Sequence, residues 1–396
     1  MDIFDLVGTQ AFSGIGRLGV ERLAATAAVG RIVARRVAAA LDVPAGAESL
    51  RDGYVVRSPG RKEGRELYFP VVGEIAAGSA PFGELAPGCA CRIFTGGLVP
   101  DGGERVVAQE ECRRLGDLVA VGEAALAERR THVRGRGSEI AKGAVLLEEG
   151  ARLEVDHLLA LTAAGVEEVE VGLRPRVAFF CTGSELVAAG EPVAGGRKSS
   201  VNTPLLHHLL PRYGAQLVEE RLVADREEEV AGLFARLAAG GCDLAITTGG
   251  MGPGKYDLVE QAFVAAGGTV LFDHLPMLPG RAILFGRLGE TLFVALPGPP
   301  YAVRTLVHEL VGPLLLFLQG ARQFRPRAIQ ATLAESCRLR AGNLLQVKAG
   351  VLTIAQGRCT VRPAQVGEAV SCFMLFPPGS EASLPGTLIE VHPVEL

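Results

Sequence analysis

The apolar positions of residues 175–323 follow two alternating periodicities. Short apolar runs such as "RVAFFCTG", "DLAITTGG" and "TLFVALPG" are separated by stretches with apolar residues three and four positions apart, such as "EEEVAGLFARLAAG". Short apolar runs favour strands, and the longer spacing favours amphipathic helices. Alternating strands and helices predict a mostly parallel sheet covered by helices on both faces. In that architecture ligands bind beyond the carboxyl ends of the strands.

The region before this one carries two other patterns. Residues 14–41 are Ala-rich with Leu, Val and Ile at spacings of three and four, which predicts an amphipathic helix broken near Gly30. Arg35 and Arg36 would lie on the polar side of that helix. Residues 53–140 contain short alternating or apolar runs between Gly and Pro residues, such as "LYFPVVGEI" and "CRIFTGG", and predict a β-rich domain.

Two further segments complete the chain. Within residues 140–173, "EVDHLLALTAAGV" predicts a helix that Gly165 closes, followed by the strand "EEVEV". Residues 324–396 return to short strands and turns, which predicts a small β-barrel or sandwich. A chain of 396 residues is too long for one hydrophobic core, so we expect about two to four domains.

Charge and composition exclude several classes of function. The net charge is -4 and the Lys and Arg residues are dispersed, which excludes non-specific binding to nucleic acid or to an anionic membrane. The N-terminus lacks a signal-peptide pattern, and no uncharged run approaches the ~20 residues of a membrane helix. The eight cysteines form no C-x-x-C pair and the seven histidines no H-x-x-x-H pair, so we expect free thiols and no structural zinc. These features predict a cytoplasmic protein.

Three glycine-bearing strand ends mark the expected ligand site. They are "CTGSEL" at residues 181–186, "TTGGMGPGKYD" at 247–257 and "LPGPP" at 296–300. Glycine lets backbone N–H groups turn outward, and a following helix N-terminus favours an anion such as phosphate. These loops lack the Walker A pattern and the spacing of a dinucleotide fingerprint. Lys255, within the second loop, can contact a phosphate as a point charge.

Carboxylates accompany these loops. Oxygen ligands of this kind can hold Mg²⁺ between protein and phosphate, and four candidates are Glu185, Asp225, Asp243 and Asp257. The alternative for each is a helix N-cap or a solvated turn acid.

Motifs running from about residue 14 to the end of the chain point to one family. The first are "GRIVARRVAAALDVPAGAESLRDGYVV", "GEIAAGSAP", "RIFTGGLVPDGGERVVAQE" and "VRGRGSEIAKGAVLLEEGARL". They are followed by "TGSEL", "VNT", "TTGGMGPGKYD", "LPGRAILFG" and "LPGPPYA". On these motifs the chain resembles the MoeA family of molybdopterin molybdenumtransferases, which is related to the E domain of gephyrin.

The resemblance implies an α/β multidomain fold. Its parts would be an elongated helical and β linker domain, a β-rich domain, a MogA-like mostly parallel α/β sandwich domain that binds molybdopterin, and a C-terminal small β-barrel. In this sequence they correspond to residues 20–45 with 141–174 (domain I), 46–140 (domain II), 1–19 with 175–323 (domain III), and 324–396 (domain IV).

The resemblance also implies an activity. Family members form homodimers whose cleft lies between the α/β domain of one subunit and the β-rich domain of the other. They bind adenylylated molybdopterin and molybdate or tungstate, and with Mg²⁺ they release AMP and insert the metal. Other cofactor-biosynthesis proteins or acceptor enzymes are implied as partners.

Matching positions carry the family's roles onto this chain. Active-site residues would be Asp52, Thr95, Glu185 and Asp257, and Glu139 stands where the family has Asp. Residues that bind the pterin or the oxyanion would be Gly183, Gly249, Gly250 and Gly254, together with Lys255 and Arg281, which stand where the family has an acid and a Lys. The change at Lys255 adds positive charge to the loop and would weaken a Mg²⁺ site that used that acid. The Mg²⁺ ligands would be Glu185, Asp225 and Asp257.

Departures from the family motifs concentrate where the oxyanion would bind. Family Lys, Asn and Ser donors are replaced or displaced at Leu278, Arg281, Pro299, Ala302 and Gly367. A dianion needs charged and hydroxyl donors around it, and Arg281, Lys348 or Ser371 would have to compensate. Two hypotheses follow: an insertase with rearranged donors, or a MoeA-like paralogue that binds molybdopterin or a nucleotide without insertion chemistry.

Overall fold

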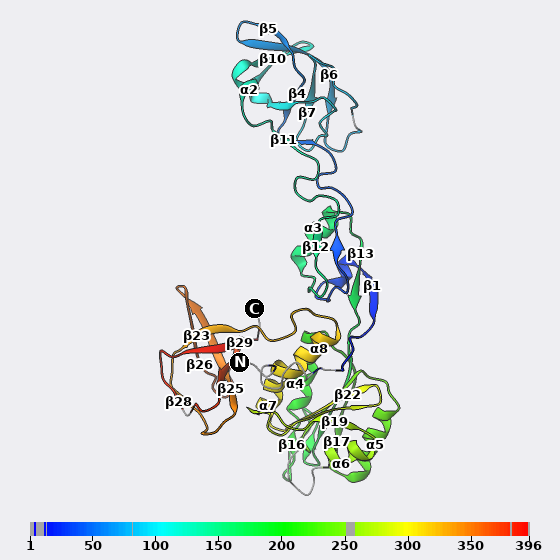
Figure 1. The fold of residues 1–396 in the computed structure, drawn as a ribbon, viewed down its shortest axis with the longest axis vertical. Coiled ribbons are helices and arrows are strands. Elements are labelled where there is room, and N and C mark those ends of the chain that lie inside the picture. Colours follow the sequence, from blue (N-terminus) through cyan, green and yellow to red (C-terminus); the bar gives the residue numbers. More distant parts are fainter. Residues whose placement is uncertain are drawn as a thin grey trace.

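The computed structural model describes residues 4, 12, 14–80, 82–250, 258–380 and 382–394. Figure 1 shows an elongated molecule with a β-rich part at one end, a narrow part in the middle, and an α/β part beside a C-terminal barrel at the other end. The chain passes through the narrow part twice, because strands before and after the β-rich part pair with each other there.

The narrow part corrects one prediction, because residues 14–41 form no long helix. Its elements are β1 (Val20–Ala24), η2 (Ala25–Ala28), β2 (Val37–Ala38), β12 (Val145–Leu147), α3 (Val155–Ala163) and β13 (Glu168–Gly172). Every residue of β1 pairs with β13, which half-buries alternate side chains of β1. Ala-rich sequence favours helix, but an isolated short helix is marginal, so strand pairing prevails. The predicted helix α3 and strand β13 are confirmed.

The β-rich part is a mainly antiparallel sheet in the order β8-β4-β7-β6-β10-β9, as its alternating pattern predicts. Its elements are β3 (Glu48–Ser49), β4 (Gly53–Val56), β5 (Arg61–Glu63), β6 (Glu66–Ile75), β7 (Ala90–Ile93), β8 (Arg105–Ala108), η3 (Gln109–Glu111), β9 (Cys112–Leu115), β10 (Leu118–Gly122), α2 (Glu123–Ala127) and β11 (Val133–Arg134). Two small apolar clusters, one around Phe69 and one around Ile93, form its core.

The α/β part has a six-stranded sheet in the order β17-β14-β18-β22-β21-β19. The first four strands run parallel to one another, whereas β21 pairs antiparallel with both of its neighbours, β22 and β19. The predicted mostly parallel sheet is thus confirmed. The strands are β14 (Arg176–Thr182), β17 (Gln216–Val223), β18 (Leu244–Thr248), β19 (Thr269–Phe272), β21 (Leu284–Leu288) and β22 (Thr291–Leu296). A separate pair, β15 (Leu186–Val187) and β16 (Lys198–Ser199), lies beyond the end of β14.

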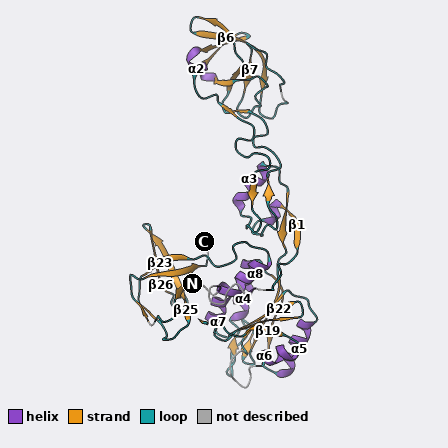
Figure 2. Ribbon diagram, viewed as in Figure 1, coloured by secondary structure: helices purple, strands orange, loops and turns teal. Residues whose placement is uncertain are grey.

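Helices cover both faces of this sheet (Figure 2). One face packs on α5 (Glu227–Ala238) and α6 (Val259–Ala265). The other face packs on α4 (Asn202–Leu209), η4 (Leu210–Tyr213), α7 (Pro300–Leu306), the π-helical segment η5 (Val307–Val311) and α8 (Gly312–Leu318). The N-terminal residues Phe4, Phe12 and Ile15 join the core of that second face.

The continuous helical run Pro300–Leu318 has the length and apolar character of a membrane-spanning helix. However, 78% of its most apolar window is buried inside the protein. We therefore assign this run to the hydrophobic core, where an all-round apolar helix is expected.

The C-terminal part is a closed five-stranded barrel, which confirms the predicted barrel. Its ring runs β25-β26-β23-β29-β27 and closes through the pairing of β25 with β27. The strands here are β23 (Ile329–Leu333), β24 (Cys337–Arg338), β25 (Leu345–Ala355), β26 (Arg358–Pro363), β27 (Cys372–Phe376), β28 (Ala382–Ser383) and β29 (Leu388–Pro393). Strand β20 (Met277–Leu278), which comes from the α/β part, adds to the barrel beside β25.

Candidate functional site

A cavity of about 530 Å³ lies at the carboxyl ends of β14, β18 and β22. The three glycine-bearing loops that follow these strands meet there, as the parallel sheet requires. Predicted site residues that line it are Glu185, Asp225, Gly249 and Gly250. The structure therefore brings together four residues that lie up to 65 positions apart in the sequence, from Glu185 to Gly250.

The glycines give room at this cavity. Gly249 has a φ of 95°, and a Cβ there would lie 2.7 Å from the carbonyl oxygen of Thr182. The N–H of Gly249 donates to the carbonyl of Leu296, and that of Gly183 donates to the carbonyl of Val223. These two N–H groups are thus already used, whereas the sequence predicts that they face an anion.

The carboxylates divide into two groups. Glu185 and Asp225 line the cavity, and the N–H of Asp225 donates to the Ser184 hydroxyl at 3.0 Å, which ties their two loops together. Asp243 instead precedes β18, at the opposite end of the strands, and accepts hydrogen bonds from the backbone and guanidinium of Arg176 at 2.8 and 3.2 Å. A metal-binding role for Asp243 at this cavity is therefore wrong. The alternative of a helix N-cap does not describe it either, because Asp243 precedes a strand and pairs with Arg176.

Part of the predicted site lies outside the described residues. This holds for Gly254, Lys255 and Asp257 in the second loop. Within the described ranges, no group of three or more His, Cys, Asp and Glu side chains is arranged to hold a metal ion.

Two cavity residues had no role assigned from sequence. Asn202 is buried, and its Nδ2 donates to the Thr248 hydroxyl at 3.2 Å and to the Gly298 carbonyl at 2.8 Å. Its Oδ1 is also buried and has no hydrogen-bond partner among the described residues. Lys198, on β16, supplies a cation to the same cavity. The "VNT" motif could have indicated Asn202, but nothing in the loop sequence distinguishes Lys198.

Asp52 and Thr95 form a second predicted pair, in the β-rich part. Strands β4 and β7 align Gly53 opposite Ile93, which brings the residues flanking them together. The backbone N–H and the hydroxyl of Thr95 both donate to Asp52 Oδ1 at 2.8 Å. These hydrogen bonds hold the pKa of the exposed Asp52 carboxyl below its usual range, with a smaller contribution from Arg92. Asp52 is therefore an ionised acceptor at neutral pH.

Glu139 lies in the same end of the molecule. Its Oε1 pairs with the guanidinium of Arg134 at 2.5 Å, and Arg134 also approaches Glu48 at 3.6 Å. Asp52 and Thr95 flank β4 and β7, and Glu139 follows β11; these strands lie at the opposite end of the chain from β16 and β17 (Figure 1).

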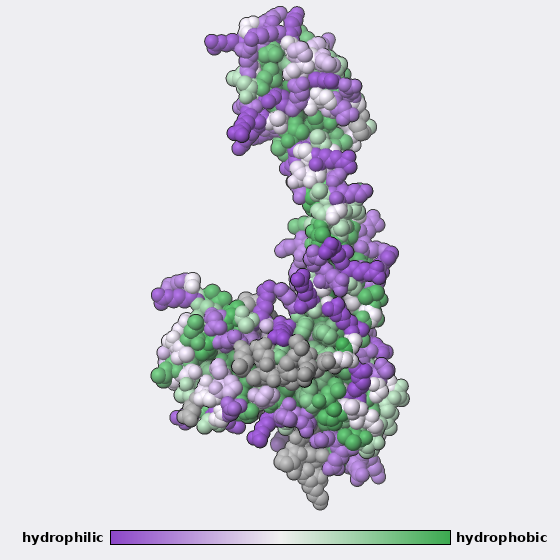
Figure 3. All heavy atoms as spheres, in the orientation of Figure 1, coloured by the Kyte–Doolittle hydropathy of each residue, from purple (hydrophilic) through white to green (hydrophobic). Residues whose placement is uncertain are grey.

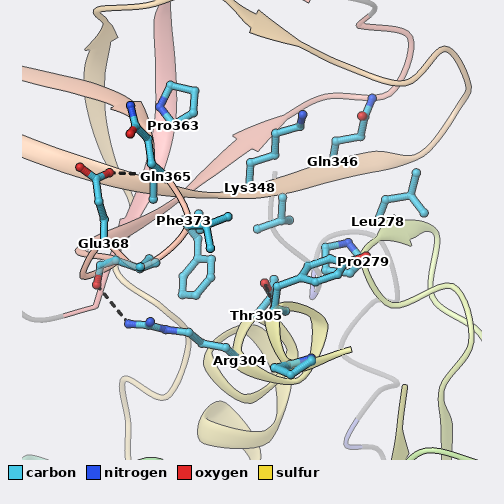
Figure 4. A pocket seen from close by; sticks show the side chains of 18 of the residues that line it. Leu278, Pro279, Arg304, Thr305, Gln346, Lys348, Pro363, Gln365, Glu368 and Phe373 are labelled. Atoms are coloured by element: carbon cyan, nitrogen blue, oxygen red, sulfur yellow. Dashed lines mark hydrogen bonds between the residues drawn. The ribbon is translucent and has the colours of Figure 1, made fainter. Parts of the chain in front are cut away.

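A larger cavity of about 940 Å³ lies between α7 and the barrel. Figure 4 shows Arg304 and Thr305 on the helix side, and Gln346, Lys348 and Phe373 on the barrel side, with the Phe373 ring pointing toward the helix. The Lys348 ammonium extends along the barrel wall and donates to the Arg338 carbonyl at 2.6 Å. This cavity adjoins the smaller one, because Val201 and Pro300 line both.

The larger cavity is rich in cations. Arg304 is half-buried, and its only hydrogen bond among the described residues goes to the Val370 carbonyl at 3.2 Å. Burial lowers the pKa of Arg304, and the nearby guanidinium of Arg212 lowers it further. Arg340 and Lys348 also line the cavity. An unneutralised, partly desolvated guanidinium is costly, so this wall favours an anionic ligand.

Glu368 is the one carboxylate among the described residues that line this cavity, and it is already neutralised. Both Glu368 oxygens accept hydrogen bonds from Arg362, each at 2.8 Å. This pairing, together with the N–H of Gln365, lowers the pKa of Glu368 to about 2. The described lining of the cavity is therefore net positive.

The family departures lie around these two cavities. Leu278 and Gly367 line the larger cavity, Pro299 lines the smaller one, and Ala302 is buried. Arg281 is exposed and lines neither.

Of the residues considered as replacements for the lost donors, Lys348 lines the larger cavity. The Ser371 hydroxyl accepts the N–H of Leu352 at 2.7 Å. Arg304 and Arg340 supply guanidinium groups that motif comparison missed, because they stand outside the compared positions.

Comparison with known proteins decides the family. Residues 9–165 match the family model "MoeA N-terminal region (domain I and II)", and residues 178–316 match "Probable molybdopterin binding domain". A molybdopterin molybdenumtransferase from Haemophilus influenzae is 32% identical over 299 residues, which cover 75% of this chain and 72% of the relative. This chain belongs to the MoeA family of molybdopterin molybdenumtransferases.

Other MoeA-family relatives agree. Molybdopterin molybdenumtransferase 2 from Mycobacterium tuberculosis is 33% identical, over 74% of both chains. The solved structure of a MoeA protein from Pyrococcus horikoshii matches with a TM-score of 0.83 and 23% identity, over 100% of this chain and 99% of that one. The predicted family and multidomain α/β fold are confirmed, and the chain belongs to a molybdenum cofactor biosynthesis family.

Proposed function

We propose that this protein inserts molybdenum or tungsten into adenylylated molybdopterin, with Mg²⁺-dependent release of AMP. The observation that carries this proposal is the buried Asn202 Oδ1, which lacks a partner among the described residues and belongs to the lining of the smaller cavity. Buried polar atoms are nearly always hydrogen-bonded, so this acceptor fits a ligand that donates N–H groups, as a pterin does.

The smaller cavity would hold the pterin and its phosphate. Lys198 supplies positive charge there, and the left-handed Gly249 leaves room for close approach. Lys255 and Gly254 keep their proposed roles in this binding. Gly183 would contribute only the space that its missing side chain leaves, because its N–H donates to Val223.

The same cavity fits Mg²⁺. Glu185 and Asp225 both line it, and paired carboxylates are the hard oxygen ligands that Mg²⁺ takes together with substrate phosphates. Asp257 would add a third carboxylate. When bound, the ion would neutralise the phosphate charge on which adenylate cleavage depends.

The larger cavity would hold the oxyanion. Arg304, Arg340 and Lys348 line it and provide the positive charge that the lost family donors no longer supply. Arg281, which is exposed, remains a further candidate donor.

A second copy of the chain would complete the site. Asp52 and Thr95 lie at the opposite end of the molecule from Glu185, so one chain does not bring these residues together (Figure 1). We propose a homodimer in which the β-rich part of one subunit covers the α/β cavities of the other. The proposed domain boundaries are those expected from sequence, and the eight free cysteines fit a cytoplasmic location.

The alternative is a paralogue that binds molybdopterin without insertion. Leu278 and Gly367, which line the larger cavity in place of family donors, favour it. Calorimetric titration with molybdate and tungstate, with and without adenylylated molybdopterin and Mg²⁺, separates the two. Saturable oxyanion binding with release of AMP supports the insertase, whereas pterin binding without either supports the paralogue.

A further inference from the structure

Two histidines and a glutamate form a buried cluster outside both cavities. His308 and Glu309 lie in the π-helical segment η5, and His392 lies in the last barrel strand, β29. Their relative exposures are 8%, 1% and 1%. Glu309 Oε1 is 2.9 Å from His308 Nδ1, and Glu309 Oε2 is 2.8 Å from His392 Nδ1. The cluster therefore joins the core helix of the α/β part to the barrel.

The hydrogen-bond partners in this cluster indicate which of its ring nitrogens donate. His308 Nε2 lies 3.2 Å from the Pro393 carbonyl oxygen, which can only accept, so this nitrogen carries a proton. Burial raises the pKa of Glu309, but the hydrogen bonds from His308 and His392 outweigh it and leave that pKa below its usual value. An ionised Glu309 also only accepts, so the two Nδ1 atoms that face it, on His308 and His392, are its hydrogen-bond donors.

The cluster lies directly behind the cationic cavity. The His308 ring packs against the Phe373 ring with centroids 4.8 Å apart, and Phe373 lines the cavity. Arg304 and Thr305, on the opposite wall, precede His308 by one helical turn. The two walls of the cavity thus belong to the two elements that the cluster joins.

Apolar packing alone would not determine how these walls align. Leu345, Val347 and Phe373 of the barrel belong to the same apolar cluster as the helix, and hydrophobic contact is non-directional. A buried ion pair adds little net stability, but its hydrogen bonds require one arrangement.

We propose that His308, Glu309 and His392 form an ionic latch that positions the barrel against the helix and so sets the spacing of Arg304 and Lys348 across the cavity. These are positioning residues, since none of them lines the cavity. The expected effect of these three residues on oxyanion binding rests on the proposed function, whereas the existence of the latch does not depend on it.

The protonation of His308 can be observed directly in the full-length protein without any ligand. Long-range ¹H–¹⁵N correlation spectra should show both His308 ring nitrogens protonated at neutral pH, with the signal assigned by its loss in His308→Gln. A spectrum with one unprotonated His308 nitrogen would overturn the ionic latch.

Substitutions at Glu309 test the positioning role. Glu309→Gln can donate to His308 and accept from His392, so tungstate affinity should stay within about twofold of wild type. Glu309→Leu removes both hydrogen bonds to Glu309 and leaves only the His308–Pro393 bond, so tungstate affinity should fall by about tenfold or more. Amide hydrogen exchange in β25 and β27 should be faster in Glu309→Leu than in wild type and should be unchanged in Glu309→Gln. The matched control is Glu220→Leu, which breaks the exposed His207–Glu220 pair and should change neither.

The outcomes separate the two proposals. If Glu309→Leu binds tungstate as tightly as wild type, or leaves exchange in β25 and β27 unchanged, the positioning role is overturned. If wild type binds no tungstate, the oxyanion site fails, while exchange and spectra still decide the latch.

The pH dependence of stability has a defined sign. Groups facing Glu309 are the two histidines and Tyr213, whose pKa is raised by burial and by this carboxylate; Glu390 approaches His392 at 3.7 Å. Because the pKa of Glu309 is lowered, its contribution is present above about pH 4.5 and is lost as pH falls through the lowered value. Between about pH 5 and 3, wild type should lose more stability to urea than Glu309→Gln. Equal losses would contradict an ionised Glu309.

Discussion

At the scale of single residues, buried polar groups whose hydrogen bonds or charge the protein does not fully compensate indicate most clearly where ligands bind. Asn202 Oδ1 is buried without a described partner, and Arg304 is half-buried beside another guanidinium. Both belong to cavity walls, and folding alone does not satisfy either. We therefore expect substitutions there to alter binding more than stability.

Lys198 should contribute to phosphate binding. In Lys198→Met, affinity for molybdopterin should fall by roughly 10- to 100-fold, because a charge-assisted hydrogen bond contributes about 1.5–3 kcal/mol. Calorimetry of both proteins measures this. The control is Lys62→Met, which removes an exposed ion pair with Glu123 in the β-rich part and should leave pterin affinity unchanged. An unchanged affinity in Lys198→Met would remove Lys198 from the proposed site.

We expect Arg304 to contribute to oxyanion binding and not to the stability of the fold. Its lowered pKa means that folding disfavours its charge, so Arg304→Met should not lower the melting temperature. Tungstate affinity should fall by about tenfold or more, since a charged donor is lost. Thermal unfolding and calorimetry on the same sample test both. Arg236→Met, which breaks an exposed pair with Glu219, is the control. A clear loss of stability in Arg304→Met would show that Arg304 is structural.

At the scale of elements, loops at strand ends depend on exact backbone shape. Gly249 and Gly190 have nearly equal positive φ values, 95° and 92°. A Cβ at Gly249 would collide with Thr182, whereas nothing lies within 4 Å of a Cβ at Gly190. The two positions therefore separate steric collision from backbone strain.

Gly249→Ala should destabilise the protein more than Gly190→Ala. Both substitutions carry the strain of a left-handed Ala, about 1 kcal/mol, but only the first adds a collision with backbone. Urea unfolding of the two variants measures the difference, which we expect to be about 1 kcal/mol or more. Equal destabilisation would mean that the Thr182 loop moves freely to make room.

At the scale of the whole molecule, the distance between the two groups of predicted residues is the main feature. Strands β4 and β7, beside Asp52 and Thr95, lie at the opposite end of an elongated chain from β16 and β17, which adjoin the cavity that Glu185 and Asp225 line (Figure 1). A narrow middle part with a mostly polar surface separates the two ends (Figure 3). The composite site that we propose would therefore need two subunits.

Mixing two inactive variants tests this composite site. Asp52→Asn and Glu185→Gln should each abolish AMP release. After the two are unfolded and refolded together, random pairing makes half of the dimers mixed, with one intact site each, so about a quarter of wild-type activity should return. Each variant refolded alone is the control. No recovery in the mixture, with dimers present, would show that Asp52 and Glu185 do not act in one site.

Patterns repeated along the sequence determined much of this protein. Apolar periodicity over residues 175–323 predicted the parallel sheet and its covering helices, because each burial pattern repeats locally. Motif order predicted the family, which the comparisons confirm. The glycine loops at strand ends predicted where a cavity would form.

Only the tertiary structure decided the rest, because it depends on contacts between distant segments. Pairing with β13 made a strand of Val20–Ala24, which lies within the segment 14–41 where the sequence predicted a helix. Asp243 precedes its strand, at the end opposite to the cavity, and is hydrogen-bonded there to Arg176. The barrel, folded back on α7, gave Arg304 its place in a cavity wall and joined Glu309 to His392 across 83 positions of sequence. Local propensity contains no information on such pairs, since their energies exist only once both segments are in place.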